Sequence, residues 1–99
     1  MSFSIHWTHD AVTSFDQNIA YLKQDWPISV AHEFLDRVDE ILEGIRANPH
    51  LYPLHRPKHR IHKCVVHPRI ILYYKIIDNA TIDLLLFWNT WKDPKRLKI

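Results

Sequence analysis

Residues 60–89 read RIHKCVVHPRIILYYKIIDNATIDLLLFWN. β-branched and aromatic side chains dominate this stretch, and two turn signals, His67-Pro68 and Asp78-Asn79, divide it. Such a composition is typical of strands, and both residues of Asp78-Asn79 tolerate the left-handed conformations of a tight hairpin turn. The pattern predicts three antiparallel strands over residues 60–66, 69–77 and 81–88.

The last of these strands carries large apolar side chains on both faces. Strict alternation divides it into two sets that point in opposite directions. The set expected in the core beneath helices is Ile82, Leu84, Leu86 and Trp88. The set expected on the other face is Thr81, Asp83, Leu85 and Phe87. With no helix to cover that face, we expect an exposed patch of the kind that marks a partner site, formed by Tyr73, Lys75, Leu85 and Phe87.

Upstream of the strands, the sequence predicts one further strand and two helices. Residues 3–7 alternate apolar and polar side chains, as a half-buried strand does. Apolar residues then recur at helical spacing over 9–25, which predicts a helix. We expect Thr8 to cap the start of this helix and Trp26-Pro27 to end it. A second and stronger helical stripe follows Ser29, its expected cap, and ends at Asn48-Pro49. Residues 50–59, framed by prolines, predict a surface loop.

The resulting order of elements, β-α-α-β-β-β, predicts the fold class. Two helices joined by so short a link pair as a hairpin. Strands segregated from helices indicate an α+β architecture, with the hairpin packed on one face of a mostly antiparallel sheet. At 99 residues we expect a single domain over 1–99, with 91–99 as a basic tail.

Composition and charge narrow the classes of protein that the chain can belong to. One cysteine, no visible signal peptide and no apolar run long enough for a membrane span predict a cytoplasmic protein that does not enter membranes. Residues 1–54 hold three Lys and Arg against eight Asp and Glu, whereas residues 55–99 hold ten against three. The basic half either faces an acidic or polyanionic partner or is neutralised by the acidic half within the fold.

Motifs for cofactors and metals are absent from the sequence. Gly44 is the only glycine, which excludes a glycine-rich loop that cradles phosphate. His55, His59 and His62 have a spacing that zinc could use, but they lie in or beside the predicted loop without a second cluster of ligands. We therefore expect no metal site and no cofactor.

Several segments, in order, resemble the RelE/ParE superfamily, the toxins of bacterial toxin–antitoxin modules. The resemblance covers nearly the whole chain, and its end is similar to the ParE-like subgroup called plasmid stabilisation proteins. The segments are Ala11-x3-Phe15, Ala31-x2-Phe34, Asn48-Pro49, Cys64-Val65-Val66, Ile71-Leu72-Tyr73-Tyr74, residues 82–89 and Lys92-Asp93-Pro94. The resemblance implies a cognate antitoxin that wraps and blocks the toxin. It also implies one of two targets, DNA gyrase for ParE-like members or mRNA in the ribosomal A site for RelE-like members.

The residues needed for RNA cleavage are incomplete. A metal-free RelE-like nuclease needs cations around the phosphate and groups that accept and donate a proton. The candidates for these roles are Arg60, Lys63, His67 and Arg69. The arginine that family members place three residues before the strand tyrosine is missing, and no His or Tyr follows the last strand. The sequence thus favours a ParE-like gyrase inhibitor over an mRNA endonuclease, with a non-toxic binding module of the same fold as the third hypothesis.

We expect the contact with the toxic target to lie in the tail, at Trp91, Lys92, Lys95 and Arg96. An aromatic anchor beside cations is typical of binding hot spots and of contacts to phosphate. The exposed sheet face with Tyr73, Lys75, Leu85 and Phe87 is the expected antitoxin surface.

Overall fold

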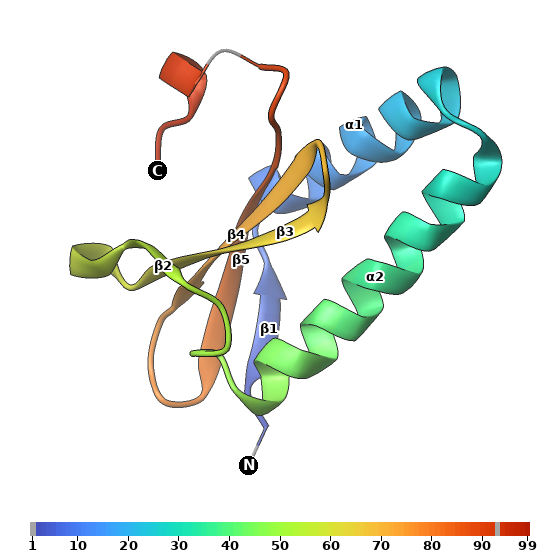
Figure 1. Ribbon diagram of the computed structural model, residues 1–99. Coiled ribbons are helices and arrows are strands. Elements are labelled where there is room, and N and C mark those ends of the chain that lie inside the picture. Colours follow the sequence, from blue (N-terminus) through green and yellow to red (C-terminus); the bar gives the residue numbers. More distant parts are fainter. Residues whose placement is uncertain (1, 93) are drawn as a thin grey trace.

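The computed structural model describes residues 2–92 and 94–99 and has two layers, a helical hairpin and a sheet (Figure 1). Asp93, which belongs to the Lys92-Asp93-Pro94 motif and to the tail, lies outside the described residues, as does Met1. The elements are β1 (Ser4–Trp7), α1 (His9–Asp25), α2 (Ile28–Ala47), β2 (Leu54–Arg56), β3 (Ile61–His67), β4 (Ile70–Ile76) and β5 (Thr81–Asn89). Two short 3-10 turns are η1 (Pro57–His59) and η2 (Pro94–Arg96).

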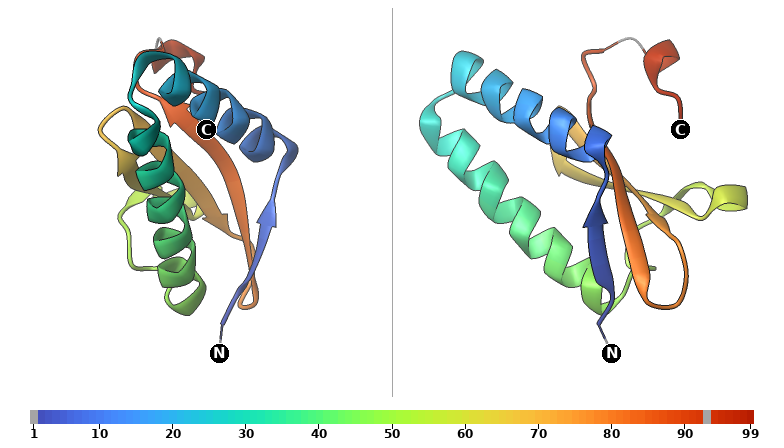
Figure 2. Two further views of the ribbon diagram at one scale, coloured as in Figure 1. Left: turned by 90° about the vertical axis from the view of Figure 1, so that its right-hand side faces the viewer. Right: turned by 180° about the vertical axis from the view of Figure 1, so that it is seen from behind.

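The five strands form one sheet in the order β1-β5-β4-β3-β2. β1 runs parallel to β5, and the other neighbours are antiparallel. Both helices lie on one side of the sheet and the C-terminal tail lies on the other (Figures 1 and 2). The predicted α+β class is confirmed. The expectation of a loop over residues 50–59 was wrong in part, because this segment contains β2. β2 is a short edge strand between prolines, and its pairing with β3 is irregular.

The helices start differently from one another. Thr8 caps α1 as predicted, because its Oγ1 accepts the backbone N–H of Ala11 at 3.2 Å. Ser29 does not cap α2, which already begins at Ile28 with Pro27 at the cap position and no capping side chain. The proline φ of −55° suits a helix start, so the helix begins directly after the ring without a hydroxyl cap.

The β4–β5 turn closes without a left-handed residue, contrary to the expectation for Asp78-Asn79. The Oδ1 atom of Asp78 accepts the N–H of Ala80 at 2.8 Å, and the N–H of Ile77 donates to the carbonyl of Thr81 at 3.0 Å. An aspartate side chain therefore closes this connection, in the manner of an Asx turn.

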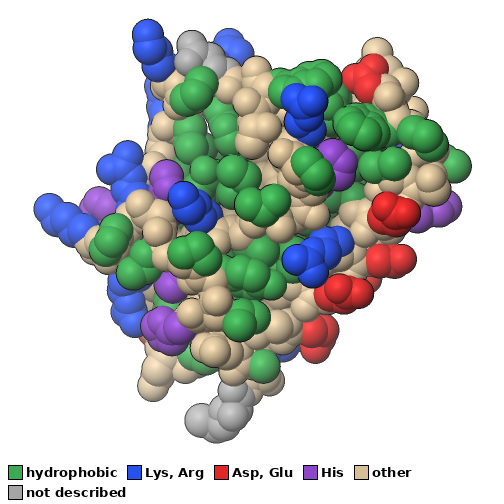
Figure 3. All heavy atoms as spheres, in the orientation of Figure 1, with side chains coloured by type: hydrophobic (Ala, Val, Ile, Leu, Met, Phe, Trp, Pro, Cys, Tyr) green, Lys and Arg blue, Asp and Glu red, His purple; other side chains and the backbone are tan. Residues whose placement is uncertain are grey.

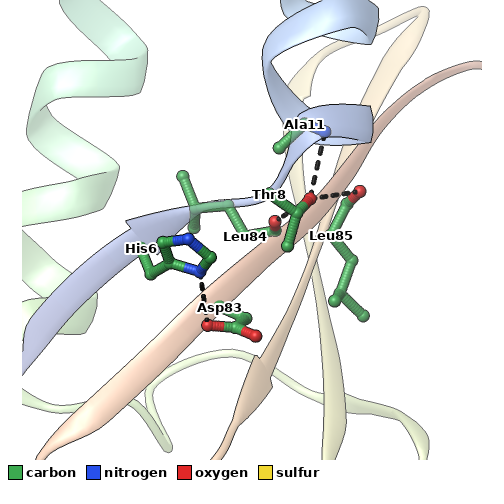
Figure 4. A network of polar contacts seen from close by, with 6 residues as sticks. All are labelled: His6, Thr8, Ala11, Asp83, Leu84 and Leu85. Carbon is green, nitrogen blue, oxygen red and sulfur yellow. Dashed lines mark hydrogen bonds and ion pairs between the residues drawn. The ribbon is translucent and has the colours of Figure 1, made fainter.

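A β-bulge in β5 decides which side chains enter the core. Tyr73 pairs with Leu86 but Tyr74 pairs with Leu84, so Leu85 is the extra residue. The hydroxyl of Thr8 donates to the carbonyl of Leu84 at 2.7 Å and lies 3.3 Å from that of Leu85 (Figure 4). The start of α1 thus holds the bulge in place, while the neighbouring pair of His6 and Asp83 links β1 to β5 at 3.0 Å.

The bulge shifts the alternation by one residue, so the predicted faces of β5 hold up to Leu85 and were wrong beyond it. Phe87 is only 1% exposed and packs under the helices, with ring centroids 5.5 Å from Trp7 and 5.2 Å from Phe15. Leu86 and Trp88 belong instead to a cluster on the opposite face.

That outer cluster gives the sheet a second, smaller core. Its buried members are Ile61, Tyr73 and Trp88, and partly buried side chains surround them: Ile71, Leu85, Leu86, Leu97 and Ile99. Two of these come from the tail, so the outer face, which we expected to be uncovered, is partly covered by the chain's own C-terminal residues.

Arg60 is the only non-glycine residue with positive φ (59°) among the described residues. It caps η1, and its N–H donates to the carbonyl of Pro57 at 3.1 Å. A left-handed conformation costs an L-residue about 1–2 kcal/mol, whereas glycine adopts it freely. We expect Arg60→Gly to raise the free energy of unfolding by about 1 kcal/mol in urea denaturation. A stability equal to that of an Arg60→Ala control would contradict this.

Candidate functional site

Trp91 is a large exposed aromatic side chain that the structure fixes directly after β5. The ring is 58% exposed, and the guanidinium carbon of Arg69 lies 4.4 Å from its centroid. The ring of Tyr21 on α1 meets it edge-on at 5.3 Å. The backbone also holds the position, because the N–H of Trp91 donates to Oδ1 of Asn89 at 3.0 Å. We call Tyr21, Arg69 and Trp91 the Trp91 cluster.

A cleft of about 250 Å³ adjoins the Trp91 cluster. It is lined by Gln17, Asn18, Tyr21, Asn89, Trp91 and Lys92. Buried Asn18 fixes the cleft between layers, because its Nδ2 donates to the carbonyls of Ser14 and Phe87, each at 2.9 Å. The cleft combines amide groups, an aromatic face and one ammonium group, which suits a polar partner with acidic side chains.

The four residues expected to bind the target do not form one compact group. Trp91 and Lys92 border the cleft, and Nζ of Lys92 lies 5.8 Å from the ring of Trp88 on the outer face. Lys95 and Arg96 lie further on, exposed in η2. Sequence reasoning missed Tyr21 and assigned Arg69 to a different role, because neither is near Trp91 in the chain.

The four candidates for RNA cleavage are dispersed. Arg60 precedes β3 and Arg69 follows it, so the whole strand of seven residues, about 23 Å long, separates them. Lys63 is exposed in the middle of the strand. His67 packs edge-on against Trp26 at 5.4 Å, and its Nδ1 accepts the N–H of Arg69 at 3.1 Å. The backbone therefore does not bring these four residues to one phosphate group.

The environment of His67 makes it a poor proton acceptor. Burial, and to a lesser extent the charge of Arg69, lower its pKa. The unfolded chain takes up a proton on this side chain near pH 6.5, and the folded chain only at lower pH, so folding is disfavoured as pH falls below about 6.5.

We expect wild-type protein to lose more stability between pH 7.5 and pH 5.5 than His67→Asn. The Oδ1 atom of asparagine can accept the same N–H, so the substitution removes the titration but keeps the hydrogen bond. Urea unfolding of both proteins at the two pH values measures this difference. The same loss in both would show that His67 does not carry the pH dependence.

The residues expected to bind the antitoxin are separated by the bulge. Phe87 lies in the core under the helices, so its assignment to the outer surface was wrong. Tyr73 is on the outer face but only 4% exposed, with the ring of His55 4.7 Å away, and burial raises its pKa. Lys75 and Leu85 are partly exposed on that face.

Of the three histidines with zinc-like spacing, His55 and His59 line one cleft, whereas His62 lies apart from them. His62 is buried, its Nδ1 donates to the carbonyl of Tyr52 at 2.7 Å, and its ring stacks on Tyr74. His55 lies on the other side of the sheet, with Nε2 3.3 Å from the carbonyl of Ile99. Over residues 2–92 and 94–99, no group of three or more His, Cys, Asp or Glu side chains is placed to hold a metal ion.

Among the described residues, the acidic and basic halves of the chain are not paired with one another. On the face drawn in Figure 3, Asp and Glu side chains lie over α2, and many of the Lys and Arg side chains lie along the opposite margin. Within the described part of the chain, the ion pairs are Arg37–Glu40, Arg46–Glu43 and His6–Asp83. None of them joins a Lys or Arg of residues 55–99 to an acidic residue of the first half. Neither helix in the described ranges has the length and apolar character needed to cross a membrane.

Comparisons with known proteins agree with this architecture. A family model described as the ParE toxin of the type II toxin–antitoxin system parDE matches residues 5–94. A comparison with curated proteins found no match. Among solved structures, the chain is similar to one from the chromosomal ParDE system of P. aeruginosa, with a TM-score of 0.68, 12% identity, and coverage of 89% of this chain and 96% of that one.

Two solved structures from Staphylococcus aureus are similar as well. The YoeB dimer has a TM-score of 0.61 and the YoeB–YefM complex one of 0.57. Each is 14% identical and covers 89% of this chain and 97% of the other. At such identities the likeness concerns the fold alone.

Proposed function

Because the chain belongs to the ParE toxin family of type II toxin–antitoxin systems, we propose that it inhibits DNA gyrase by binding and that a cognate antitoxin neutralises it. One observation carries the choice of target. The dispersed candidates Arg60, Lys63, His67 and Arg69 do not form a phosphate-cleaving group, whereas Trp91 with Arg69 forms an exposed aromatic and cationic contact. An exposed anchor of this kind is a means of binding a protein, which requires no covalent step.

The proposed contact with gyrase centres on the Trp91 cluster and continues into the tail. Arg69 stacks on one face of Trp91, so the indole is held in one orientation before it binds. A preorganised side chain loses less conformational entropy on association. Lys92, Lys95 and Arg96 follow and supply positive charge for an acidic surface of the target.

We place the antitoxin on the outer face of the sheet. Lys75 and Leu85 are partly exposed there, beside Val65, which is 60% exposed. Tyr73 lies beneath them and would contact an antitoxin only if the tail moved aside. Solved structures of this fold include one from a ParDE system and one of a YoeB–YefM complex, which supports a protein partner for this chain too.

Three assays distinguish the possible targets. Purified toxin is added to a gyrase supercoiling assay and, separately, to an in vitro translation reaction whose mRNA is then analysed by primer extension. In the third assay, expression of the toxin gene is induced in growing cells. We expect loss of supercoiling, intact mRNA and filamentous growth arrest. Cleavage of the mRNA at rates comparable to those of active RelE-like toxins would show that the protein is an endonuclease and not a gyrase inhibitor. Normal growth with intact supercoiling and mRNA would indicate a non-toxic binding module.

We expect Leu85→Glu to weaken the antitoxin complex by more than about 2 kcal/mol, because it places a charge in the middle of a partly apolar surface. Isothermal titration calorimetry with the antitoxin measures the effect. Val12→Glu is the matched control, since Val12 is 45% exposed on α1, away from that face. An affinity unchanged by Leu85→Glu would exclude the outer face as the antitoxin site.

A further inference from the structure

Two neighbouring clefts on the outer side of the molecule are lined with positive charge. One, of about 420 Å³, is formed by residues 55–59. The other, of about 380 Å³, is formed by Arg56, His59, Ile61, Lys75, Lys98 and Ile99. Arg56 and His59 line both, so the two clefts form a continuous surface, which we call the basic surface.

The basic surface gathers several cations and has no acidic side chain in its lining. Its Lys and Arg residues are Arg56, Lys58, Lys75 and Lys98. No Asp or Glu lines either cleft, and none of these four side chains forms an ion pair within the described part of the chain. Asp83 stands opposite Lys75 in the β4–β5 register, and Arg56 donates to an oxygen of Ile99, whereas among the described residues no partner of this kind accompanies Lys58 or Lys98. Cations that share one surface repel each other, and an anionic partner would relieve that repulsion.

The loop that presents these charges is strained and anchored. It projects from the sheet as β2 and η1 (Figure 1) and ends at Arg60, the residue with left-handed φ. The Nε atom of Arg56 donates to the carbonyl of Ile99 at 2.8 Å, which ties the loop to the tail that carries Lys98. Backbone strain of this kind persists where the surrounding structure enforces it, and it concentrates at binding sites.

We propose that the basic surface binds the phosphate backbone of duplex DNA, independently of any contact with gyrase. Neither cleft is lined by Phe, Tyr or Trp, so the surface lacks the aromatic platforms on which unpaired bases stack. Lys and Arg without base-stacking groups are suited to phosphates whose bases stay stacked in a duplex. Binding through phosphates alone is independent of DNA sequence and depends strongly on salt.

Fluorescence anisotropy with a labelled duplex of mixed sequence tests this proposal in the absence of gyrase. Four phosphate contacts predict that the logarithm of the association constant falls with the logarithm of the salt concentration with a slope of about −3 to −4. We expect the double variant Lys58→Ala, Lys98→Ala to reduce that slope by about 2 and the affinity at least about tenfold. Both residues are exposed, and Arg56 is left intact because it anchors the tail.

The matched control is the double variant Lys23→Ala, Arg37→Ala, which removes the same net charge from the helical layer. We expect its affinity to stay within twofold of wild type. If the first double variant unfolds, Lys58→Ala alone replaces it, with an expected slope reduction of about 1.

Several outcomes would overturn the proposal. They are the absence of binding at low salt, equal losses in the two double variants, or tighter binding of single-stranded RNA than of duplex. Release of the DNA by polyglutamate at equal charge concentration would assign the surface to an acidic protein instead. Because gyrase is absent from the assay, none of these results bears on the supercoiling experiment.

Discussion

Trp91→Ala is expected to abolish growth inhibition while the protein stays folded and still binds its antitoxin. The indole is 58% exposed, so its packing contributes little to stability, but it is the one large anchor of the proposed gyrase contact. Loss of a central aromatic hot spot costs at least about 2 kcal/mol, or roughly 30-fold in affinity. The supercoiling assay should show a corresponding rise in the inhibitory concentration.

Two variants separate the loss of the anchor from other effects. Trp91→Phe keeps an aromatic ring for Arg69 to stack on, and we expect it to retain part of the inhibition. Ile28→Ala removes a side chain of similar exposure (57%) at the start of α2, outside the Trp91 cluster and the lining of its cleft, and should act like wild type. Full toxicity of Trp91→Ala would move the target contact away from the Trp91 cluster.

Phe87→Ala is expected to destabilise the protein by about 3–5 kcal/mol. The ring is 1% exposed and contacts Trp7, Phe15 and Phe34, so its removal leaves a cavity between the sheet and both helices. Small domains have only about 5–15 kcal/mol of stability in total. For a domain of this size, we expect the melting temperature to fall by roughly 15–30 °C.

Leu86→Ala is the informative comparison for Phe87→Ala. Strict alternation would place Leu86 in the core and Phe87 on the surface, whereas the bulge at Leu85 places them the other way round. Leu86 is partly exposed, so its truncation should cost about 1–2 kcal/mol. A larger loss for Leu86→Ala than for Phe87→Ala in urea unfolding would contradict the bulged register.

The tail has a structural role that the sequence did not indicate. Leu97 and Ile99 pack on the outer cluster, and Arg56 holds the carbonyl of Ile99. A stretch with the composition Pro-Lys-Arg-Leu-Lys-Ile has too few apolar residues to predict such packing, because a tail is fixed by its docking site rather than by its own periodicity.

By itself, the sequence determined the helices and strands that carry long apolar patterns. The stripe of α2 and the β-branched runs of β3, β4 and β5 are local, so period and turn residues sufficed to predict the α+β class. Short-range chemistry also predicted the Thr8 cap, since an N-cap involves only the next three residues. The order of these patterns along the chain was enough for the sequence to show its resemblance to a toxin family.

Only the tertiary structure decided which side chains form each surface. The bulge in β5 is held by Thr8, more than seventy residues earlier, which donates to the carbonyl of Leu84, and no local pattern encodes that contact. One extra residue then reverses the faces of every side chain beyond it, since strand side chains alternate with a period of two. The same is true of the Trp91 cluster: Tyr21, Arg69 and Trp91 meet because α1, the β3–β4 turn and the end of β5 converge in the folded chain.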